Sequence, residues 1–218
     1  AGSYTLTVDG FEVPQGVQKF YVVWDMVEDG ITVTYPNGAE GFVVGETEVI
    51  RWDDASQSTQ SYTAEYSIDN GSTWNNIASN IPYIKRQWSF LVPAVSTDQA
   101  LIRISRGSQS DVSDNTFSIF PEILNLSVVF ECPDSVGLQW TPVAGAVAYE
   151  ASMLGDMYMD SVATSSSSSV TIHGTVPNVD KWFSVRAIGA NGGKGRRVNA
   201  IFKPAGTYNC PLAYDNEM

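Results

Sequence analysis

The chain has 218 residues, of which 43% are hydrophobic and 11% aromatic, enough to bury one or two cores and to exclude a disordered chain. Twelve Lys and Arg against 24 Asp and Glu leave a net charge of −12, which repels phosphate backbones, so we expect no nucleic-acid partner. No run of about 18 apolar residues occurs, so we expect no membrane insertion.

The first 29 residues predict a β-hairpin. Apolar and polar side chains alternate over residues 4–8 and again over residues 20–26, and a turn containing Pro14 and Gly16 separates the two segments. Because two strands are rarely stable alone, residues 1–29 are interpreted as the end of an upstream β domain or as a hairpin packed on the next module.

Residues 30–120 predict a first β-sandwich, because short strand-like segments alternate with turns rich in Gly, Pro, Asn and Asp. Trp52 is the expected core indole, since Ile50 and Trp52 face one way and Arg51 the other. Pro121 marks the expected boundary. The expected strands are Ile31–Tyr35, Glu48–Trp52, Tyr62–Ser67, Gln87–Val92, Ala100–Arg106 and Thr116–Phe120.

Residues 121–210 carry the most specific pattern of the chain. The stretch Leu138–Ala151 resembles the B-to-C region of fibronectin type III domains, with Trp140 on strand B and Tyr149 on strand C. The stretch Lys181–Gly192 is similar to strand F of that family and its Gly-rich F–G turn. The resemblance implies a second β-sandwich, which is followed by an acidic tail, residues 211–218. Trp182 stands where the family usually has a tyrosine that tethers a neighbouring loop.

A second resemblance concerns the first sandwich. Residues 34–40 (TYPNGAE), 44–47 (VGET) and 50–52 (IRW) resemble the opening of immunoglobulin-like modules in secreted multidomain proteins of Bacteroidetes-type bacteria. In that group, such a module followed by a fibronectin type III module is an accessory region of extracellular peptidases and of surface proteins exported through the type IX pathway. The resemblance implies a non-catalytic role beside other domains of the same polypeptide.

The segment Ser67–Trp74 matches the pattern Ser-x-Asp-x-Gly-x-Thr-Trp, known as the Asp-box. In this motif the Ser and Asp side chains bind turn amides, the glycine supplies a positive φ, and the tryptophan packs under the hairpin. One copy is too few for a propeller, so the motif is interpreted as structural. Its residues are Ser67, Asp69, Gly71, Thr73 and Trp74.

The chain holds one histidine, His173, and two cysteines, Cys132 and Cys210. A multi-histidine metal site is therefore excluded, and no Gly-x-Ser-x-Gly turn accompanies His173, so we expect no catalytic residue. The cysteines are too few for a structural zinc site and favour one disulfide, with two buried thiols as the alternative. A disulfide indicates a secreted or cell-surface location.

No cofactor is expected, and calcium is the metal that the acidic surface favours. Asp111, Asp114 and Asp69 are the candidate calcium ligands, against the interpretation that they are solvated turn residues. The basic cluster Gly192–Arg197 lacks P-loop spacing and is interpreted as a turn between strands F and G.

The resulting hypothesis is a non-catalytic interaction or spacer region that positions a catalytic or adhesive domain of a secreted bacterial protein. Its partners would be other domains of the same polypeptide and protein or polysaccharide surfaces. The alternatives are a carbohydrate-binding module, with Trp24, Trp88 and Tyr83 as candidate glycan-stacking residues, and a self-assembling surface or adhesin subunit. An enzyme is not expected.

Overall fold

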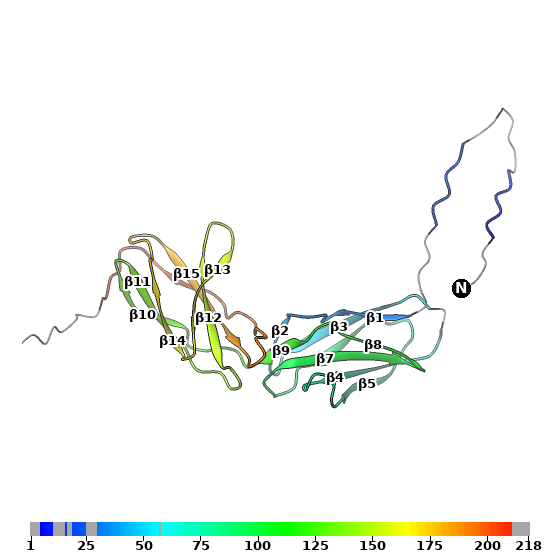
Figure 1. Cartoon of the computed structure of the whole chain (residues 1–218), viewed down its shortest axis with the longest axis horizontal. Helices are drawn as coiled ribbons and strands as arrows, with labels where there is room; N and C mark the ends of the chain where they lie inside the picture. Colours follow the sequence, from blue (N-terminus) through cyan, green and yellow to red (C-terminus); the bar gives the residue numbers. More distant parts are fainter. Residues whose placement is uncertain (1–4, 11–15, 17–18, 25–29, 57, 211–218) are drawn as a thin grey trace, which may run out of the picture.

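The computed structural model describes residues 5–10, 16, 19–24, 30–56 and 58–210. Throughout these residues every regular element is a β-strand, which confirms the predicted all-β class. The strands form two modules that lie end to end (Figure 1): the first holds β1 to β9, and the second holds β10 to β16. None of the described residues belongs to a helix that could cross a membrane.

The first module is a β-sandwich. One sheet has the order β1-β3-β6; the other has the order β2-β9-β7-β4-β5, with β8 pairing with β7. β2 runs parallel to β9, and the other pairs are antiparallel. The strands are β1 Ile31–Tyr35, β2 Gly41–Val43, β3 Thr47–Asp54, β4 Tyr62–Ser67, β5 Asn75–Ile81, β6 Gln87–Leu91, β7 Thr97–Arg106, β8 Gln109–Val112 and β9 Phe117–Phe120.

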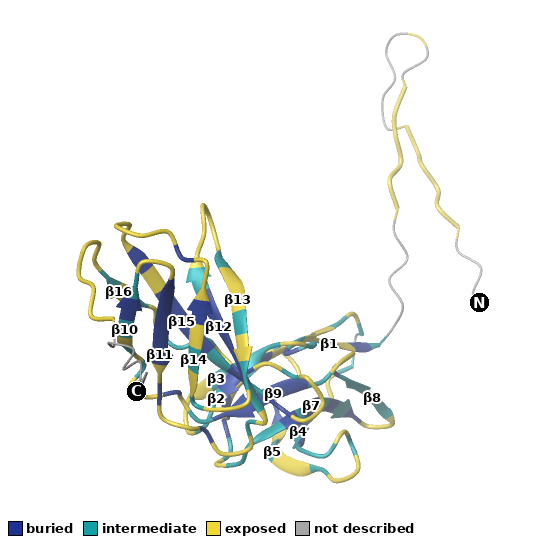
Figure 2. Ribbon diagram, turned by 60° about the vertical axis from the view of Figure 1, so that its left-hand side comes forward, coloured by how far each residue is buried: buried dark blue, intermediate teal, exposed yellow. Residues whose placement is uncertain are grey.

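The core of the first module follows from the alternation of its strands. Trp52 on β3 is 1% exposed, which confirms the predicted core indole, and its ring meets the Tyr62 ring edge-on with centroids 5.3 Å apart. The core cluster draws on both sheets of the module, and Figure 2 colours buried stretches of its strands dark blue. Burying a side chain of this size stabilises the fold by about 3 kcal/mol.

The second module is also a β-sandwich, with one sheet in the order β10-β11-β14 and the other in the order β13-β12-β15-β16. Together the two modules confirm the predicted tandem of sandwiches. The strands are β10 Ser127–Cys132, β11 Ser135–Gln139, β12 Ala148–Leu154, β13 Met159–Ser165, β14 Ser169–His173, β15 Lys181–Ile188 and β16 Ile201–Lys203.

An aromatic pair anchors the core of the second module. Trp140 directly follows β11 and is 3% exposed, and its ring meets that of Tyr149 on β12 at 5.2 Å between centroids. The Tyr149 hydroxyl accepts a hydrogen bond from the Val143 backbone at 2.8 Å, so the buried phenol has a polar partner.

Strand β15 carries two adjacent aromatic residues, Trp182 and Phe183. Trp182 lies on the outer face of the sheet, 41% exposed, and its ring packs against Phe202 of β16 at 4.9 Å. The next residue, Phe183, is the inward-facing aromatic and is fully buried. Successive side chains of a strand point to opposite faces, so only one of two adjacent aromatics can enter the core.

The first module also contains three strands that the sequence patterns did not predict, β2, β5 and β8. β2 has only three residues and pairs in parallel with a distant strand. β5 is rich in asparagine, a residue with a low strand propensity, and it forms because β4 supplies hydrogen-bond partners.

The predicted hairpin of residues 1–29 is wrong where the structure describes it. Residues 5–10 and 19–24 contain no strand, and their side chains are exposed, as Figure 2 shows by their yellow trace. The physical reason is that neither segment is covered by the modules, so strand pairing would bury almost no apolar surface. The remaining residues of the predicted hairpin, and the acidic tail 211–218, lie outside the described residues.

Candidate functional site: the joint between the modules

The two modules meet at a glycine-rich turn that follows β15. Gly189 donates a backbone hydrogen bond to the Gly193 carbonyl at 2.8 Å, and Gly192 donates to the Gly189 carbonyl at 3.1 Å. The predicted turn between strands F and G is thereby confirmed. We call residues 189–195 the joint turn, because its backbone packs against the first module.

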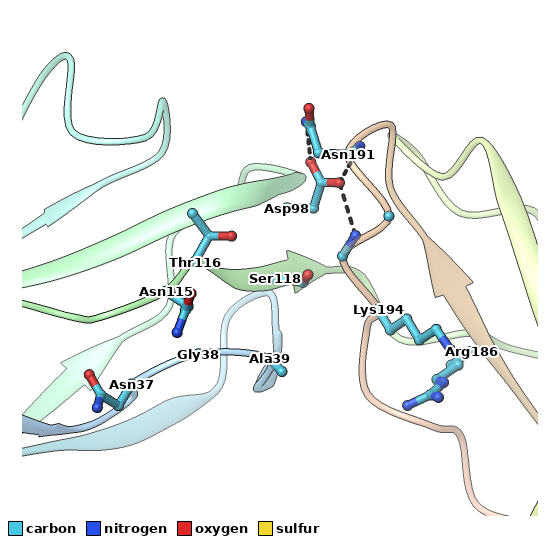
Figure 3. Close-up of a pocket in the computed structure, with 12 residues that line it drawn as sticks. Asn37, Gly38, Ala39, Asp98, Asn115, Thr116, Ser118, Arg186, Asn191 and Lys194 are labelled. Carbon is cyan, nitrogen blue, oxygen red and sulfur yellow. Dashed lines mark hydrogen bonds between the residues drawn. The ribbon is translucent and has the colours of Figure 1, made fainter.

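Asp98, on β7 of the first module, caps the joint turn (Figure 3). Its carboxylate accepts hydrogen bonds from the Asn191 backbone at 2.6 Å, the Asn191 side-chain amide at 3.0 Å and the Gly193 backbone at 3.2 Å. Asp98 is 7% exposed. Burial alone would raise its pKa, but the hydrogen bonds from Asn191 and Gly193 outweigh burial and lower the pKa below its ordinary value. The ionised carboxylate therefore stabilises the joint.

Glycine is required where the backbones approach each other most closely. A Cβ at Gly193 would lie 2.5 Å from the Asp98 Cβ and 2.6 Å from the Ser118 hydroxyl. A Cβ at Gly41, on β2, would lie 2.3 Å from the Arg196 nitrogen. Any larger residue at either position would push the modules apart.

Arg196, directly after the joint turn, reaches across to the first module. Its Nε donates to the Gly41 carbonyl at 3.2 Å, and its two Nη atoms bind the carboxylates of Glu46 and Glu48. Burial lowers the Arg196 pKa, but the hydrogen bonds to Glu48 and Glu46 raise it overall. Because Arg196 is partly exposed, this contact fixes orientation more than it adds stability.

The polypeptide connection between the modules carries residues of the second core. Phe120 is the last residue of β9 in the first module, yet its side chain belongs to the core of the second module together with Ile123. A Cβ built on Gly195 of the joint turn would lie 3.0 Å from the Phe120 ring. The connection therefore holds a core residue at the joint.

Near the joint turn, Glu150 on β12 forms ion pairs with three basic residues of the second module. Its carboxylate pairs with Arg186 at 2.7 Å, Lys194 at 2.6 Å and Arg197 at 2.9 Å. Glu150 is 4% exposed. Burial would raise its pKa, but the hydrogen bonds from Lys194 and Arg197 and the charge of Arg186 lower it to about 2. Two cations of the basic cluster, Lys194 and Arg197, thus share one buried carboxylate of the second module.

A groove of about 610 Å³ opens beside the joint. Figure 3 shows the first module supplying Asn37, Asn115 and Thr116 to one wall, while Lys194 and Arg186 lie on the other. The walls offer amide, hydroxyl and backbone groups, which donate and accept hydrogen bonds. The full lining is Asn37, Gly38, Ala39, Asp98, Asn115, Thr116, Ser118, Arg186, Asn191, Gly192, Gly193 and Lys194.

The Asp-box residues lie together in the turn between β4 and β5. Asp69 accepts hydrogen bonds from the Thr73 backbone at 2.8 Å, the Thr73 hydroxyl at 2.6 Å and the Ser67 hydroxyl at 2.7 Å. Ser67 in turn accepts from the Gly71 backbone at 2.8 Å, and Gly71 has a φ of 84°. The ring of Trp74 lies under the Arg103 guanidinium at 4.2 Å. The local hydrogen bonds agree with the structural interpretation of the motif.

Replacing Asp69 with asparagine is expected to lower the thermal unfolding midpoint of the first module. The Thr73 and Ser67 hydrogen bonds lower the Asp69 pKa to about 2. A lowered folded-state pKa gives stability that is present above the ordinary pKa and lost as pH falls toward about 2, so the difference from wild type should shrink in acid. Asp53→Asn, at an exposed position on β3, is the control; equal effects of the two variants would contradict the prediction.

The candidate calcium ligands are not brought together. Asp111 accepts a hydrogen bond from the Val33 backbone at 2.7 Å, and Asp114 binds the Asn37 side-chain amide at 2.7 Å. Asp69 is engaged in its own turn. The described residues contain no group of three or more His, Cys, Asp or Glu side chains arranged to hold a metal ion.

The candidate glycan-stacking residues are also separate, since no ring contact joins any two of them in the described part of the chain. Trp24 is 73% exposed in the N-terminal segment, and Tyr83 is 44% exposed between β5 and β6. Trp88 on β6 is half-buried against the first core and lines a groove of about 340 Å³ with Val49.

The predicted disulfide is confirmed: Cys132 at the end of β10 is bonded to Cys210. The neighbouring backbones are paired as well, because Asn209 donates to the Glu131 carbonyl at 3.2 Å and its side chain accepts from the Glu131 backbone at 2.7 Å. The disulfide thus fastens the segment after β16 to β10. His173 ends β14 at an exposed position.

The joint itself was not found from the sequence. Asp98 and Asn191 are 93 residues apart, and the glycine-rich turn looked like an ordinary hairpin connection. The sequence feature that indicates the joint is the group of glycines next to Asn191. Glycines also occur where a second backbone approaches closely.

No protein-family model matches the chain, and no curated protein matches it. Solved structures similar to it include a segment of two fibronectin type III domains from chicken tenascin, at 14% identity, covering 81% of this chain and 98% of that one with a TM-score of 0.42. The FN1–FN3 domains of chicken CNTN1 match at 14% identity over 81% of this chain and 69% of that one, TM-score 0.35. A fibronectin type III domain from the human KIAA0970 protein matches at 18% identity over 44% of this chain and 81% of that one, TM-score 0.35.

Proposed function

We propose that the chain is a non-catalytic spacer and interaction region of a secreted or cell-surface multidomain protein. In this role it fixes the orientation of a neighbouring catalytic or adhesive domain. The resemblance of residues 34–52 to modules of secreted Bacteroidetes-type proteins supports a bacterial source and a place beside a peptidase or adhesin. Its partners would be other domains of the same polypeptide and protein or polysaccharide surfaces.

The observation that carries the proposal is the joint. A flexible linker lets two domains reorient, which is the default for small, polar contacts within a chain. Here Asp98 caps the joint turn, and Arg196 reaches back to Glu46 and Glu48. Phe120, the last residue of β9, packs in the core of the second module. A tandem held in this way transmits a fixed orientation from one end to the other.

The location rests on the disulfide and the charge. Disulfides persist in oxidising compartments such as the cell exterior, and the pair Cys132–Cys210 is the whole cysteine content of the chain. A net charge of −12 favours solubility and disfavours nonspecific adsorption to anionic surfaces.

A distance measurement across the joint tests the proposal. Spin labels on Ser108→Cys in the first module and Ser166→Cys in the second, both exposed positions, report the inter-module distance by pulsed electron resonance. We expect a narrow distribution for the otherwise unchanged chain. The double change Asp98→Ala with Arg196→Ala should widen the distribution about twofold, because it removes contacts that fix the joint. Gly193→Val should widen it by a similar factor, because its side chain would collide with Asp98 and push the modules apart.

Lys85→Ala with Asp156→Ala, at exposed positions away from the joint, is the matched control and should leave the distribution narrow. A broad distribution in the unchanged chain would overturn the proposal, because a flexible tandem cannot fix orientation. A narrow distribution that persists in all the joint variants would show that the named contacts do not set the angle.

A further inference from the structure

The N-terminal segment presents an apolar stretch that pairs with no strand among the described residues. We call residues 19–24 the arm. Phe20, Val22 and Trp24 are 64%, 45% and 73% exposed, and the alternate residues Tyr21 and Val23 are more than 90% exposed. Five successive β-branched or aromatic residues without a charge or proline form a segment that pairs readily with a sheet edge. Both faces of the arm are apolar, as in a strand that is covered on two sides.

The second module carries an exposed apolar row on the outer face of its β13-β12-β15-β16 sheet. Leu154 pairs opposite Met159 of β13, and Trp182 pairs opposite Phe202 of β16. Since Met153 is opposite Phe183, the next residue, Leu154, falls beside Trp182. We call Met159, Leu154, Trp182 and Phe202 the apolar row; its last three members are 41% to 47% exposed.

The apolar row ends at an open edge. β16 pairs with β15 and is the last strand of its sheet among the described residues. A strand added beside β16 would gain backbone hydrogen bonds and would place one face of its side chains in line with Phe202. The edge thus has the hydrogen-bonding groups and the apolar neighbour that the arm lacks.

Charge selects the direction of such a strand. Asp180 lies at the far end of β16, where its carboxylate accepts a hydrogen bond from the Ala205 backbone at 2.9 Å. If Val22 lies opposite Phe202 in an antiparallel pair, Lys19 falls opposite Ala205 and next to Asp180. Phe20, Val22 and Trp24 then continue the apolar row, while Tyr21 and Val23 face the side of the sandwich. The parallel direction would put Lys19 at the other end of β16.

The two surfaces lie at opposite ends of the molecule, since the arm precedes β1 at the outer end of the first module and β16 belongs to the second module (Figure 1). We propose that a second copy of this chain is the occupant: the arm of one copy adds as an antiparallel strand to β16 of the next, giving head-to-tail association. Such a contact joins two different surfaces and continues from copy to copy.

Sedimentation equilibrium of the whole chain over a hundredfold concentration range tests the proposal. We expect the average mass to rise beyond that of a dimer without a plateau. Val22→Pro removes a backbone donor from the arm and should abolish the rise, while Val22→Thr keeps the donor and the branched side chain and should retain it. Phe202→Asp and, independently, Trp182→Ser should also abolish the rise. Thr171→Asp, exposed on β14 of the other sheet, is the control and should behave as the unchanged chain.

Mixing the variants gives the sharpest result. Val22→Pro retains an intact edge and Phe202→Asp retains an intact arm, so an equimolar mixture should form a one-to-one complex and stop there. Association of Phe202→Asp and Trp182→Ser alone at the unchanged strength would overturn the proposal in favour of arm-to-arm pairing. A chain that stays monomeric at all concentrations would also overturn it. Neither result bears on the rigidity of the joint, which the distance measurement reports separately.

Discussion

Replacing Glu150 with alanine is expected to lower the free energy of unfolding of the second module by about 3 kcal/mol, the low end for breaking a buried ion pair. The carboxylate is 4% exposed and is the shared partner of Arg186, Lys194 and Arg197. Its loss leaves these cations crowded together. They remain partly exposed, which lets water offset part of the cost. Urea unfolding measures the change in free energy, and hydrogen exchange of β12 and β15 reports it for the second module.

The lowered pKa of Glu150 predicts that the stability of the second module depends on pH. The pKa of Glu150 is lowered from its ordinary 4.5 to about 2, so its contribution is present above pH 4.5 and is lost as pH falls through 2. The stability difference between the unchanged chain and Glu150→Gln should therefore shrink over this interval. Glu122→Gln, at an exposed position after β9, should show no such difference. A gap that stays constant down to pH 2 would contradict the assignment.

Removing the disulfide by Cys132→Ser with Cys210→Ser is expected to cost the second module about 4 kcal/mol. The two cysteines are 78 residues apart, and closing a loop of this length restricts the unfolded chain by roughly that free energy in the chain-entropy description. The midpoint of urea unfolding of the second module should fall, while that of the first module should not change.

Reduction of the unchanged chain with a thiol reagent should reproduce the effect, and the same reagent should leave the double serine variant unaffected. If reduction and the double variant both leave the second module at its original stability, the hydrogen bonds between Asn209 and Glu131 are sufficient to hold the segment after β16.

The fold was predictable where local alternation and burial agree. Trp52 between outward-facing neighbours, the Asp-box turn and the pairing of Cys132 with Cys210 all follow from residue types and spacing. Residue types were not sufficient where the deciding partner is distant. Trp182 and Phe183 are adjacent aromatics, and only the register of β12 against β15 determines that Phe183 enters the core.

The joint shows the same limit for the candidate site. Nothing beside Asp98 in the sequence indicates that it caps a turn of the other module, and Glu150 sits in an apolar strand with its cations 36 to 47 residues away. The Asp98 contact depends on how two folded modules dock, and the Glu150 ion pairs depend on the pairing of β12 with β15 within the second module. The sequence patterns therefore predict a tandem, but not the contacts that fix the angle between its two modules.

The disulfide also determines which residues a pulling force can reach. Tension applied between the first module and a point beyond Cys210 would pass along β10 to Cys132 and leave directly through the sulfur atoms. The strands β11 to β16 lie inside the covalent loop, off the path of tension. Stretching can therefore extend the first module and the connection to β10. The residues between Cys132 and Cys210 add no end-to-end extension even if they unfold, because the disulfide closes them into a loop.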